Sequence, residues 1–211
     1  MKFKLLFSYR FLLFILSVLG VYLQLTKHGG FGMMLYYTIL SNMFVMFFMG
    51  DMVWRMLRGR STQTKGYLRM KGAVTMAIMI TFVIYHFMLA PLATPEKFYR
   101  LENFLCHYIV PLMFFFDTLV VDKAKQYRKL DPFLWTLIPL AYMLFALLNG
   151  LVLKWPIPGA KDSPFAYFFI NVNKFGWAFV GKWVVIIFIA YLLAGYVLYG
   201  IKNIKRKSAV S

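Results

Sequence analysis

Residues 182–202 read KWVVIIFIAYLLAGYVLYGIK. The residues between the two lysines carry no charge, and a helix that spans a lipid bilayer needs about 20 consecutive, mostly apolar residues. Five further stretches have the same character, and they cover roughly residues 5–25, 32–54, 71–91, 102–121 and 133–153. The sequence therefore predicts an all-α polytopic membrane protein, in which residues 1–211 form a single bundle of six transmembrane helices.

The overall composition agrees with a chain that folds in lipid. Hydrophobic residues make up 62% of the sequence, whereas soluble domains usually contain about 45–50% apolar residues. Lys and Arg outnumber Asp and Glu by 24 to 7, which in a soluble protein would suggest a nucleic-acid partner. Here the basic residues lie between long apolar runs, so we expect no nucleic acid as a partner. Cys106 is the single cysteine, so no intrachain disulfide can form.

The distribution of basic residues predicts the orientation, because cytoplasmic loops of membrane proteins carry an excess of Lys and Arg. Of the 24 basic residues, 17 lie in residues 1–10, 55–71, 123–129 and 202–207, and the other 7 lie in the alternate segments. We therefore expect both termini on the cytoplasmic side. The first apolar run is too long for the core of a cleavable signal peptide, so we expect it to remain as the first span.

Proline positions predict where the helices bend. Pro111 and Pro139 fall inside the fourth and fifth spans, where each should kink the helix and free a backbone carbonyl one turn earlier. Residues 154–181 form the longest segment outside the spans, and they contain the run Tyr167-Phe168-Phe169-Ile170. This run is too aromatic for a free loop, so we expect the segment to lie on the outer membrane surface or to fold back over the bundle.

Four polar side chains lie at similar depth below the outer boundary of the bilayer. With a rise of about 1.5 Å per residue, Thr38 and His107 each lie roughly 9 Å deep, His86 roughly 7 Å and Asn149 about 6 Å. Polar groups inside a membrane are costly and tend to face the interior of the bundle. Because these four side chains come from four helices, the sequence predicts a polar site in the outer third of the bundle.

Further polar residues share helix faces with these four: Ser41 and Asn42 with Thr38, Asn103 with His107, and Tyr142 with Asn149. The spacing of four residues lets the amide of Asn103 orient the imidazole of His107. Cys106 points about 100° away from His107 around the helix, which argues against a Cys–His dyad.

Thr38 and His107 together have the chemistry of a hydrolase. A hydroxyl becomes a useful nucleophile when a base within about 3 Å takes its proton, and neutral imidazole suits that task. Attack on an ester carbonyl creates an oxyanion that needs preorganised donors, for which Asn42, Tyr142 and Asn149 are candidates. A structural interpretation of Thr38 is also open, since a threonine in a spanning helix usually bonds the carbonyl four residues earlier. Two intramembrane histidines without a carboxylate cluster predict no metal site.

The acidic residues near the cytoplasmic ends of the spans favour structural roles. Asp51 has Arg55 one turn on, so a local ion pair is expected. Asp117 should pair with a basic side chain of a neighbouring helix. Asp122 and Asp131 are expected in loops or at helix caps.

Several stretches together carry a resemblance to a known family: Tyr37-Thr38-Ile39-Leu40-Ser41-Asn42, residues 85–91 (YHFMLAP), residues 105–111 (LCHYIVP), Pro139-Leu140-Ala141-Tyr142 with Asn149-Gly150, and residues 167–172 (YFFINV). They resemble motifs of a bacterial family of six-helix membrane proteins. That family is similar in turn to the eukaryotic androgen-induced transmembrane proteins, which are threonine hydrolases of fatty acid esters of hydroxy fatty acids. The resemblance implies a bacterial cell membrane, and it places the required threonine and histidine of those enzymes at Thr38 and His107.

We therefore expect an intramembrane hydrolase of lipid fatty-acyl esters, with Thr38 as nucleophile, His107 as general base and no cofactor. The partner is then a membrane lipid or lipid ester, and the residues expected to support the site or bind substrate are Ser41, Asn42, His86, Asn103, Tyr142 and Asn149. Two alternatives stay open: a non-enzymatic protein or transporter that binds a lipid or small molecule, and a b-type haem protein with His86 and His107 as axial ligands. The oligomeric state also stays open.

Overall fold

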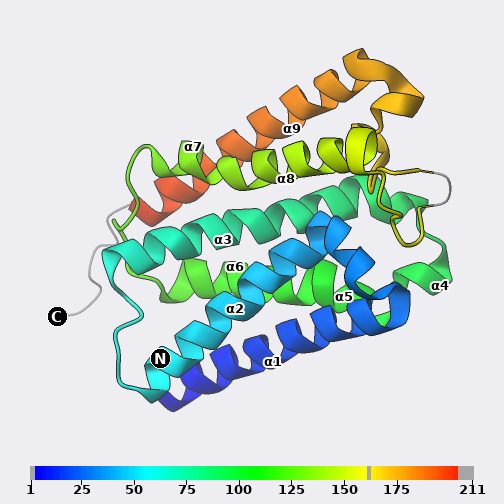
Figure 1. Ribbon diagram of the computed structural model, residues 1–211. Helices are drawn as coiled ribbons and strands as arrows, with labels where there is room; N and C mark the ends of the chain where they lie inside the picture. The colour runs from blue at the N-terminus through cyan, green and yellow to red at the C-terminus, as the bar shows by residue number, and fades with distance from the viewer. Residues whose placement is uncertain (1–2, 161–162, 204–211) are drawn as a thin grey trace.

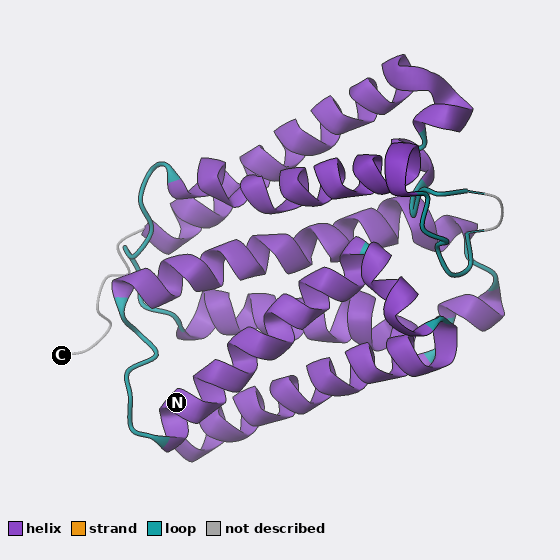
Figure 2. Ribbon diagram, in the orientation of Figure 1, coloured by secondary structure: helices purple, strands orange, loops and turns teal. Residues whose placement is uncertain are grey.

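The computed structural model describes residues 3–160 and 163–203, and within them the chain consists of helices and connecting segments without a strand (Figure 2). Six helical stretches are long and apolar enough to cross a membrane: Phe3–His28, Tyr37–Leu57, Lys65–Leu92, Leu101–Val121, Asp131–Leu153 and Val172–Asn203. The prediction of an all-α polytopic bundle is confirmed. Of the basic residues counted for orientation, Lys2, Lys161 and those at 205–207 lie outside the described residues.

The first two spans are α1 (Phe3–His28) and α2 (Tyr37–Leu57), joined by η1 (Gly30–Leu35). The third span combines α3 (Lys65–Ile84), η2 (Tyr85–Leu89) and η3 (Ala90–Leu92), and the short α4 (Pro95–Phe98) follows it. The fourth combines α5 (Leu101–Phe104), η4 (Leu105–Ile109) and α6 (Val110–Val121). The fifth contains α7 (Asp131–Trp135), α8 (Leu137–Leu148) and η5 (Asn149–Leu153), and η6 (Phe168–Ile170) precedes α9 (Val172–Asn203). The elements η2, η4 and η5 are π-helical turns.

The helices lie side by side in an elongated bundle (Figure 1). Figure 1 shows α1 and α2 along one side, α8 and α9 along the other, and α3 between them. The beginning of α1 and the end of α9 lie at the same end, which we call the terminal end. The short α4 and the described residues of the segment 154–171, which are 154–160 and 163–171, lie at the opposite end, which we call the α4 end. Because the number of spans is even, the beginning of α1 and the end of α9 lie at the same end of the bundle.

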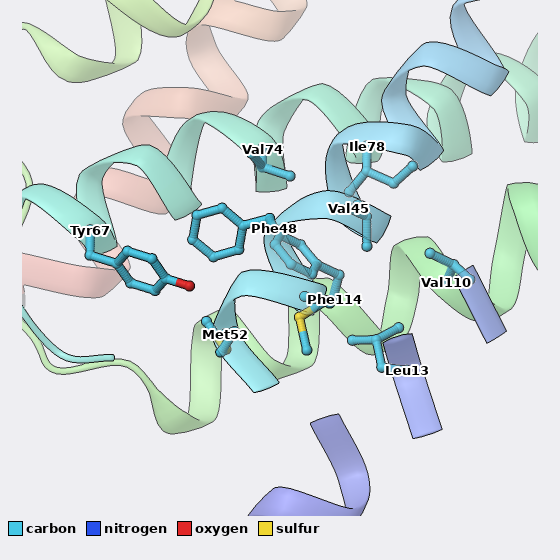
Figure 3. Packing of buried hydrophobic residues seen from close by; sticks show 10 residues of the cluster. Leu13, Val45, Phe48, Met52, Tyr67, Val74, Ile78, Val110 and Phe114 are labelled. Atoms are coloured by element: carbon cyan, nitrogen blue, oxygen red, sulfur yellow. The ribbon is translucent and has the colours of Figure 1, made fainter. Parts of the chain in front are cut away.

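An apolar core joins α1, α2, α3 and α6 (Figure 3). In it, the ring of Phe48 on α2 packs edge-to-face on Phe114 of α6, with ring centroids 6.0 Å apart. The other members are Leu13, Val45, Met49, Met52, Tyr67, Val74, Ile78 and Val110. This packing fixes α2 against α6, and the turn directly before α6 carries His107.

Both internal prolines interrupt their helices as predicted, and each freed carbonyl has a new donor. Before Pro139, the helix breaks at Thr136 between α7 and α8, and the hydroxyl of Tyr191 donates to the carbonyl of Trp135 (3.2 Å). Pro111 has no N–H for the carbonyl of Cys106, five residues earlier in the π-helical turn η4. The amide of Asn42 on α2 donates to that carbonyl instead (3.0 Å).

The last span begins earlier than predicted, because α9 starts at Val172 and the expected span started at residue 182. The predicted span begins at Lys182 because this residue is charged, but the helix begins earlier in the chain and includes Lys182. Gly176 interrupts α9 with a positive φ of 77°, a conformation that glycine adopts without steric cost. The segment outside the spans is therefore 154–171, shorter than the expected 154–181.

Buried charges connect three helices near the terminal end. Asp117 of α6 receives two hydrogen bonds from the guanidinium of Arg10 on α1 (both 3.1 Å) and one from Lys71 on α3. Lys71 also bonds Asp122 (2.7 Å). All four side chains are almost fully buried, so each charge depends on its partner. The predicted pairing of Asp117 with neighbouring helices is confirmed.

The other acidic residues behave largely as expected. Asp51 and Arg55 form the local ion pair (2.6 Å). Asp131 begins α7 and pairs with Arg69 of α3 (2.6 Å). Asp122 lies in the connection after α6, but it is more than a loop residue because it belongs to the buried charge cluster.

Candidate functional site

Thr38 and His107 meet inside the bundle near the α4 end. Thr38 is the second residue of α2 and His107 lies in η4, and both are buried. Oγ1 of Thr38 lies 3.3 Å from Nε2 of His107. Because Thr38 stands in the first turn of α2, no carbonyl of its own helix lies four residues earlier. Its hydroxyl therefore does not make the back-bond usual for threonine in a spanning helix.

The other nitrogen of His107 fixes the tautomer of the ring. Nδ1 lies 3.0 Å from the backbone carbonyl of Asn103, and a carbonyl oxygen can only accept a hydrogen bond. Nδ1 therefore carries the hydrogen and donates it, which leaves the lone pair of Nε2 facing Thr38. In this tautomer the Thr38 hydroxyl donates to Nε2, as a nucleophile does to its general base.

The Asn103 amide supports His107 by a different route from the one expected. It donates to the hydroxyl of Tyr85 (2.6 Å) and to the carbonyl of Phe98 (2.8 Å). The ring of Tyr85 stacks on the imidazole of His107, with centroids 3.8 Å apart and planes inclined by 22°. Asn103 thus holds His107 directly through its backbone carbonyl and indirectly through Tyr85, while its amide does not touch the imidazole.

Tyr167, like Tyr85, lies at this site although the sequence did not predict it there. Its hydroxyl lies 3.5 Å from Oγ1 of Thr38 and accepts a hydrogen bond from the backbone N–H of Thr38 (3.4 Å). Burial raises the pKa of Tyr167, so its hydroxyl stays protonated at neutral pH and keeps a hydrogen to donate. The aromatic run at 167–170 indicated that this segment could fold back over the bundle, but not which side chain reaches Thr38.

Asn149 binds the segment 154–171, which contains Tyr167. Its amide donates to the carbonyls of Trp155 and Pro164 (3.3 and 3.1 Å), and its oxygen accepts from the N–H of Trp155 (3.1 Å). The hydroxyl of Tyr36 also donates to the carbonyl of Pro158 (2.6 Å). The segment 154–171 is therefore tied to α2 and to η5, which agrees with the expectation that it folds back over the bundle.

The three candidate oxyanion donors have no hydrogen left for an oxyanion. Both amide hydrogens of Asn42 are donated to the carbonyls of Thr38 (2.8 Å) and Cys106 (3.0 Å). The hydroxyl of Tyr142 donates to the carbonyl of Leu35 (2.9 Å), and Asn149 is occupied by the segment 154–171. The expected role is wrong for this structure, because these side chains donate to backbone carbonyls around the site.

Ser41 also supports the backbone around Thr38. Its hydroxyl donates to the carbonyl of Thr38 (3.1 Å) and pairs with the hydroxyl of Thr81 on α3 (2.7 Å). Ser41 is fully buried. It therefore links the start of α2 to α3 without reaching His107.

His86 does not join the site. It is exposed on the outside of the bundle, where Nδ1 lies 3.3 Å from the hydroxyl of Tyr108. Both nitrogens of His107 already have partners. The two rings thus do not form the facing pair of free ligands that a b-type haem needs. Among the described residues, no group of three or more His, Cys, Asp or Glu could hold a metal ion.

A cavity of about 100 Å³ adjoins Thr38. Five tyrosines line it together with apolar side chains of α3, α8 and α9, and these tyrosines are Tyr37, Tyr85, Tyr142, Tyr167 and Tyr191. His107 does not line the cavity. A molecule in the cavity therefore meets the hydroxyl of Thr38, with the imidazole behind it.

No protein-family model matches this chain, and no curated protein or solved structure gives a match to it. The similarity to the threonine hydrolases therefore remains an expectation from short motifs. The function is therefore proposed from the geometry around Thr38.

Proposed function

We propose that this chain is an intramembrane hydrolase that cleaves fatty-acyl esters of lipids, with Thr38 as nucleophile and His107 as general base. One observation carries the proposal: a hydroxyl 3.3 Å from the unprotonated nitrogen of a buried histidine whose other nitrogen is fixed by a carbonyl. A threonine hydroxyl with such a base is activated for attack on an ester.

In the first half of the reaction, the Thr38 hydroxyl gives its proton to Nε2 of His107 while Oγ1 bonds to the ester carbonyl carbon. The carbonyl oxygen becomes an oxyanion. When this intermediate collapses, the bond to the alcohol oxygen breaks, and Nε2 returns the proton to the departing alcohol. Thr38 is left acylated. Water then gives a proton to Nε2 and attacks the acyl carbon. The bond from that carbon to Oγ1 breaks, Nε2 returns the proton to Oγ1, and the fatty acid leaves.

The hydroxyl of Tyr167 is the donor best placed for the oxyanion, because it lies within 3.5 Å of the attacking oxygen and keeps its hydrogen. The Asn103 carbonyl stabilises the imidazolium that forms on His107 by accepting the hydrogen of Nδ1. A neutral carbonyl stabilises this cation less than a carboxylate does. We therefore expect a slower enzyme than one with an acidic third member.

Substitution of the two central residues tests the proposal. Thr38→Ala and His107→Ala should each lower hydrolysis of a fluorogenic long-chain acyl ester by a factor of about 10³ or more. His86→Ala is the matched control, because this histidine is exposed and does not reach Thr38; it should keep close to wild-type activity. Full activity of a well-folded Thr38→Ala or His107→Ala variant would falsify the assignment.

A second candidate function is the binding of a lipid or small molecule without hydrolysis. The lining of the cavity favours it, because tyrosines and apolar side chains surround the hollow at Thr38, and a mostly apolar hollow with a few hydroxyls is typical of a site that binds a ligand. A fluorophosphonate probe separates the two functions. A hydrolase forms a covalent bond between Oγ1 of Thr38 and the phosphorus of the probe, whereas a binding protein stays unlabelled at Thr38.

We also propose that the chain lies in a bacterial cell membrane with both termini in the cytoplasm. The excess of Lys and Arg at 1–10, 55–71, 123–129 and 202–207 supports this orientation. The site at the α4 end then faces the outer leaflet. The test fuses to the C-terminus a reporter enzyme that is active only after export from the cytoplasm. If the C-terminus is cytoplasmic, this reporter should stay inactive.

A further inference from the structure

An apolar groove runs along the bundle between α3 and α9. Its volume is about 510 Å³. Residues from α3, η2, α6 and α9 line it, and none of them is charged. Its one hydroxyl belongs to Tyr191, which already donates to the carbonyl of Trp135. The groove therefore offers no free hydrogen-bonding side-chain hydroxyl and no charge, and it suits a hydrocarbon.

The groove is long enough for a lipid tail and has the surroundings of one. Along α9 its lining extends from Trp183 to Ile201, which is about 27 Å at the rise of an α-helix. The hydrocarbon core of a bilayer is about 30 Å thick and consists of two leaflets, so the groove can hold the whole acyl chain of a lipid from one leaflet. Every lining residue belongs to a membrane-spanning stretch. The medium at its opening is therefore the acyl chains of the bilayer.

The groove adjoins the cavity at Thr38. Four residues line both hollows: Ile80 and Ile84 of α3, and Ile187 and Tyr191 of α9. Beyond this shared wall, the groove continues toward the terminal end past Ala190 and Ala194. These two small side chains leave room between α3 and α9.

We propose that the groove between α3 and α9 holds one acyl chain of a membrane lipid, and that the acyl chain of the substrate reaches Thr38 across the shared wall. The carbonyl then lies at Thr38, and the tail runs along the groove past Ala194. The consequence for substrate choice rests on the proposed hydrolase: the groove selects long, unbranched chains. Occupancy of the groove by a lipid does not depend on hydrolysis.

A tryptophan that fills the groove tests the inference. Ala194→Trp places a large ring in the groove, and Ile189→Trp is the matched control on the same helix, since Ile189 is exposed and lines neither hollow. The protein is reconstituted in phosphatidylcholine vesicles that carry a diazirine in one acyl chain, and the adducts are mapped by mass spectrometry. All variants also carry Thr38→Ala, so that the adducts report occupancy without turnover.

Lipid adducts should concentrate on groove residues such as Met79 and Ala190. Ala194→Trp should remove most of them, and Ile189→Trp should leave them in place. Equal labelling of Ile189 and the groove residues, or groove residues that carry no adducts, would overturn the inference. These outcomes do not depend on whether Thr38 is catalytic, so they separate failure of the groove from failure of the hydrolase.

Activity with Thr38 intact gives the second readout. Ala194→Trp should lower kcat/KM for a long-chain ester by about tenfold and leave a short-chain ester unchanged, because a short chain ends before Ala194. An equal loss for both esters would contradict a role in chain-length selection. Loss of both activities in Ala194→Trp, together with the expected loss of the lipid adducts, would leave occupancy of the groove standing and would contradict only the proposed route from the groove to Thr38.

Discussion

For single residues, the position of one hydrogen decides what Thr38 and His107 can do. The Asn103 carbonyl accepts the hydrogen of Nδ1, so Nε2 presents its lone pair to the Thr38 hydroxyl. A carboxylate at the same place would stabilise the imidazolium more strongly, but it would add a charge inside the membrane, where unpaired charges are costly. A backbone carbonyl fixes the same tautomer without that cost.

Tyr167→Phe tests the donor to the oxyanion. The substitution removes one hydroxyl and keeps the ring that packs on Tyr142 and Phe169. We expect kcat for a long-chain ester to fall by a factor of about 10², because loss of one oxyanion donor typically has an effect of that size. KM should change little. The measurement is steady-state hydrolysis in detergent micelles or vesicles.

Tyr99→Phe serves as the control for that experiment, because Tyr99 is 73% exposed and has no contact with Thr38. It should keep wild-type kinetics. If Tyr167→Phe were as active as Tyr99→Phe, the Tyr167 hydroxyl would be a structural partner of the Thr38 N–H and not a catalytic donor.

The sequence could place Thr38 and His107 at one depth, because distance along a helix follows from residue number. It could not assign the hydrogen bonds of Asn42, since one of them reaches the carbonyl of Cys106 on a neighbouring span, which Pro111 leaves without a backbone donor. It could not identify Tyr167 either. The direction of that hydroxyl depends on how the segment 154–171 folds.

Among the helical elements, three spans contain a π-helical turn near the α4 end, and each turn contains a polar residue considered above: His86 in η2, His107 in η4 and Asn149 in η5. Such turns widen the helix locally and often occur at functional sites. Pro111 explains the turn at His107, because it removes an N–H from the following helix. The sequence predicted a kink there, but hydrophobic periodicity does not distinguish a kink from a π-helical turn.

Gly150→Ala tests how η5 supports the outer segment. A Cβ at residue 150 would collide with the ring of Phe165, which is almost fully buried. Overpacking of this kind costs about 1–3 kcal/mol. Because Phe165 lies two residues before Tyr167, we expect both a lower unfolding temperature in detergent and a lower kcat.

Gly181→Ala is the matched control for Gly150→Ala, since no atom lies within 4 Å of a Cβ built at this position of α9. It should leave activity unchanged. Equal behaviour of the two variants would show that Phe165 adjusts without moving Tyr167, and that η5 does not position the segment.

On the scale of the whole molecule, the bundle has buried polar clusters near its two ends. Arg10, Lys71, Asp117 and Asp122 connect α1, α3 and α6 near the terminal end. Thr38 and His107 lie near the α4 end, and along the fourth span Val110 and Phe114 of the apolar core (Figure 3) lie between His107 and Asp117. The number of spans was predictable from hydropathy, because each span must satisfy its own backbone in lipid. Which helices are neighbours was not, since that depends on side-chain pairing between spans.

Lys71→Met tests the charge cluster. It leaves Asp122 buried without its closest cation, while Asp117 keeps both hydrogen bonds from Arg10. Breaking a buried pair by removing one partner costs about 3–5 kcal/mol, so thermal unfolding in detergent should shift strongly downward. Adding Asp122→Asn should recover part of the loss, because it removes a buried carboxylate whose remaining cation, Arg10, lies 3.9 Å away. Lys65→Met is the control, because Lys65 lies at the exposed start of α3, and it should not lower the unfolding temperature. A decrease as large as that of Lys71→Met would mean that both variants report general damage to α3.

The charge cluster and Thr38 lie near opposite ends of the bundle. Each of these variants that remains folded at the assay temperature should therefore hydrolyse esters with the wild-type kcat.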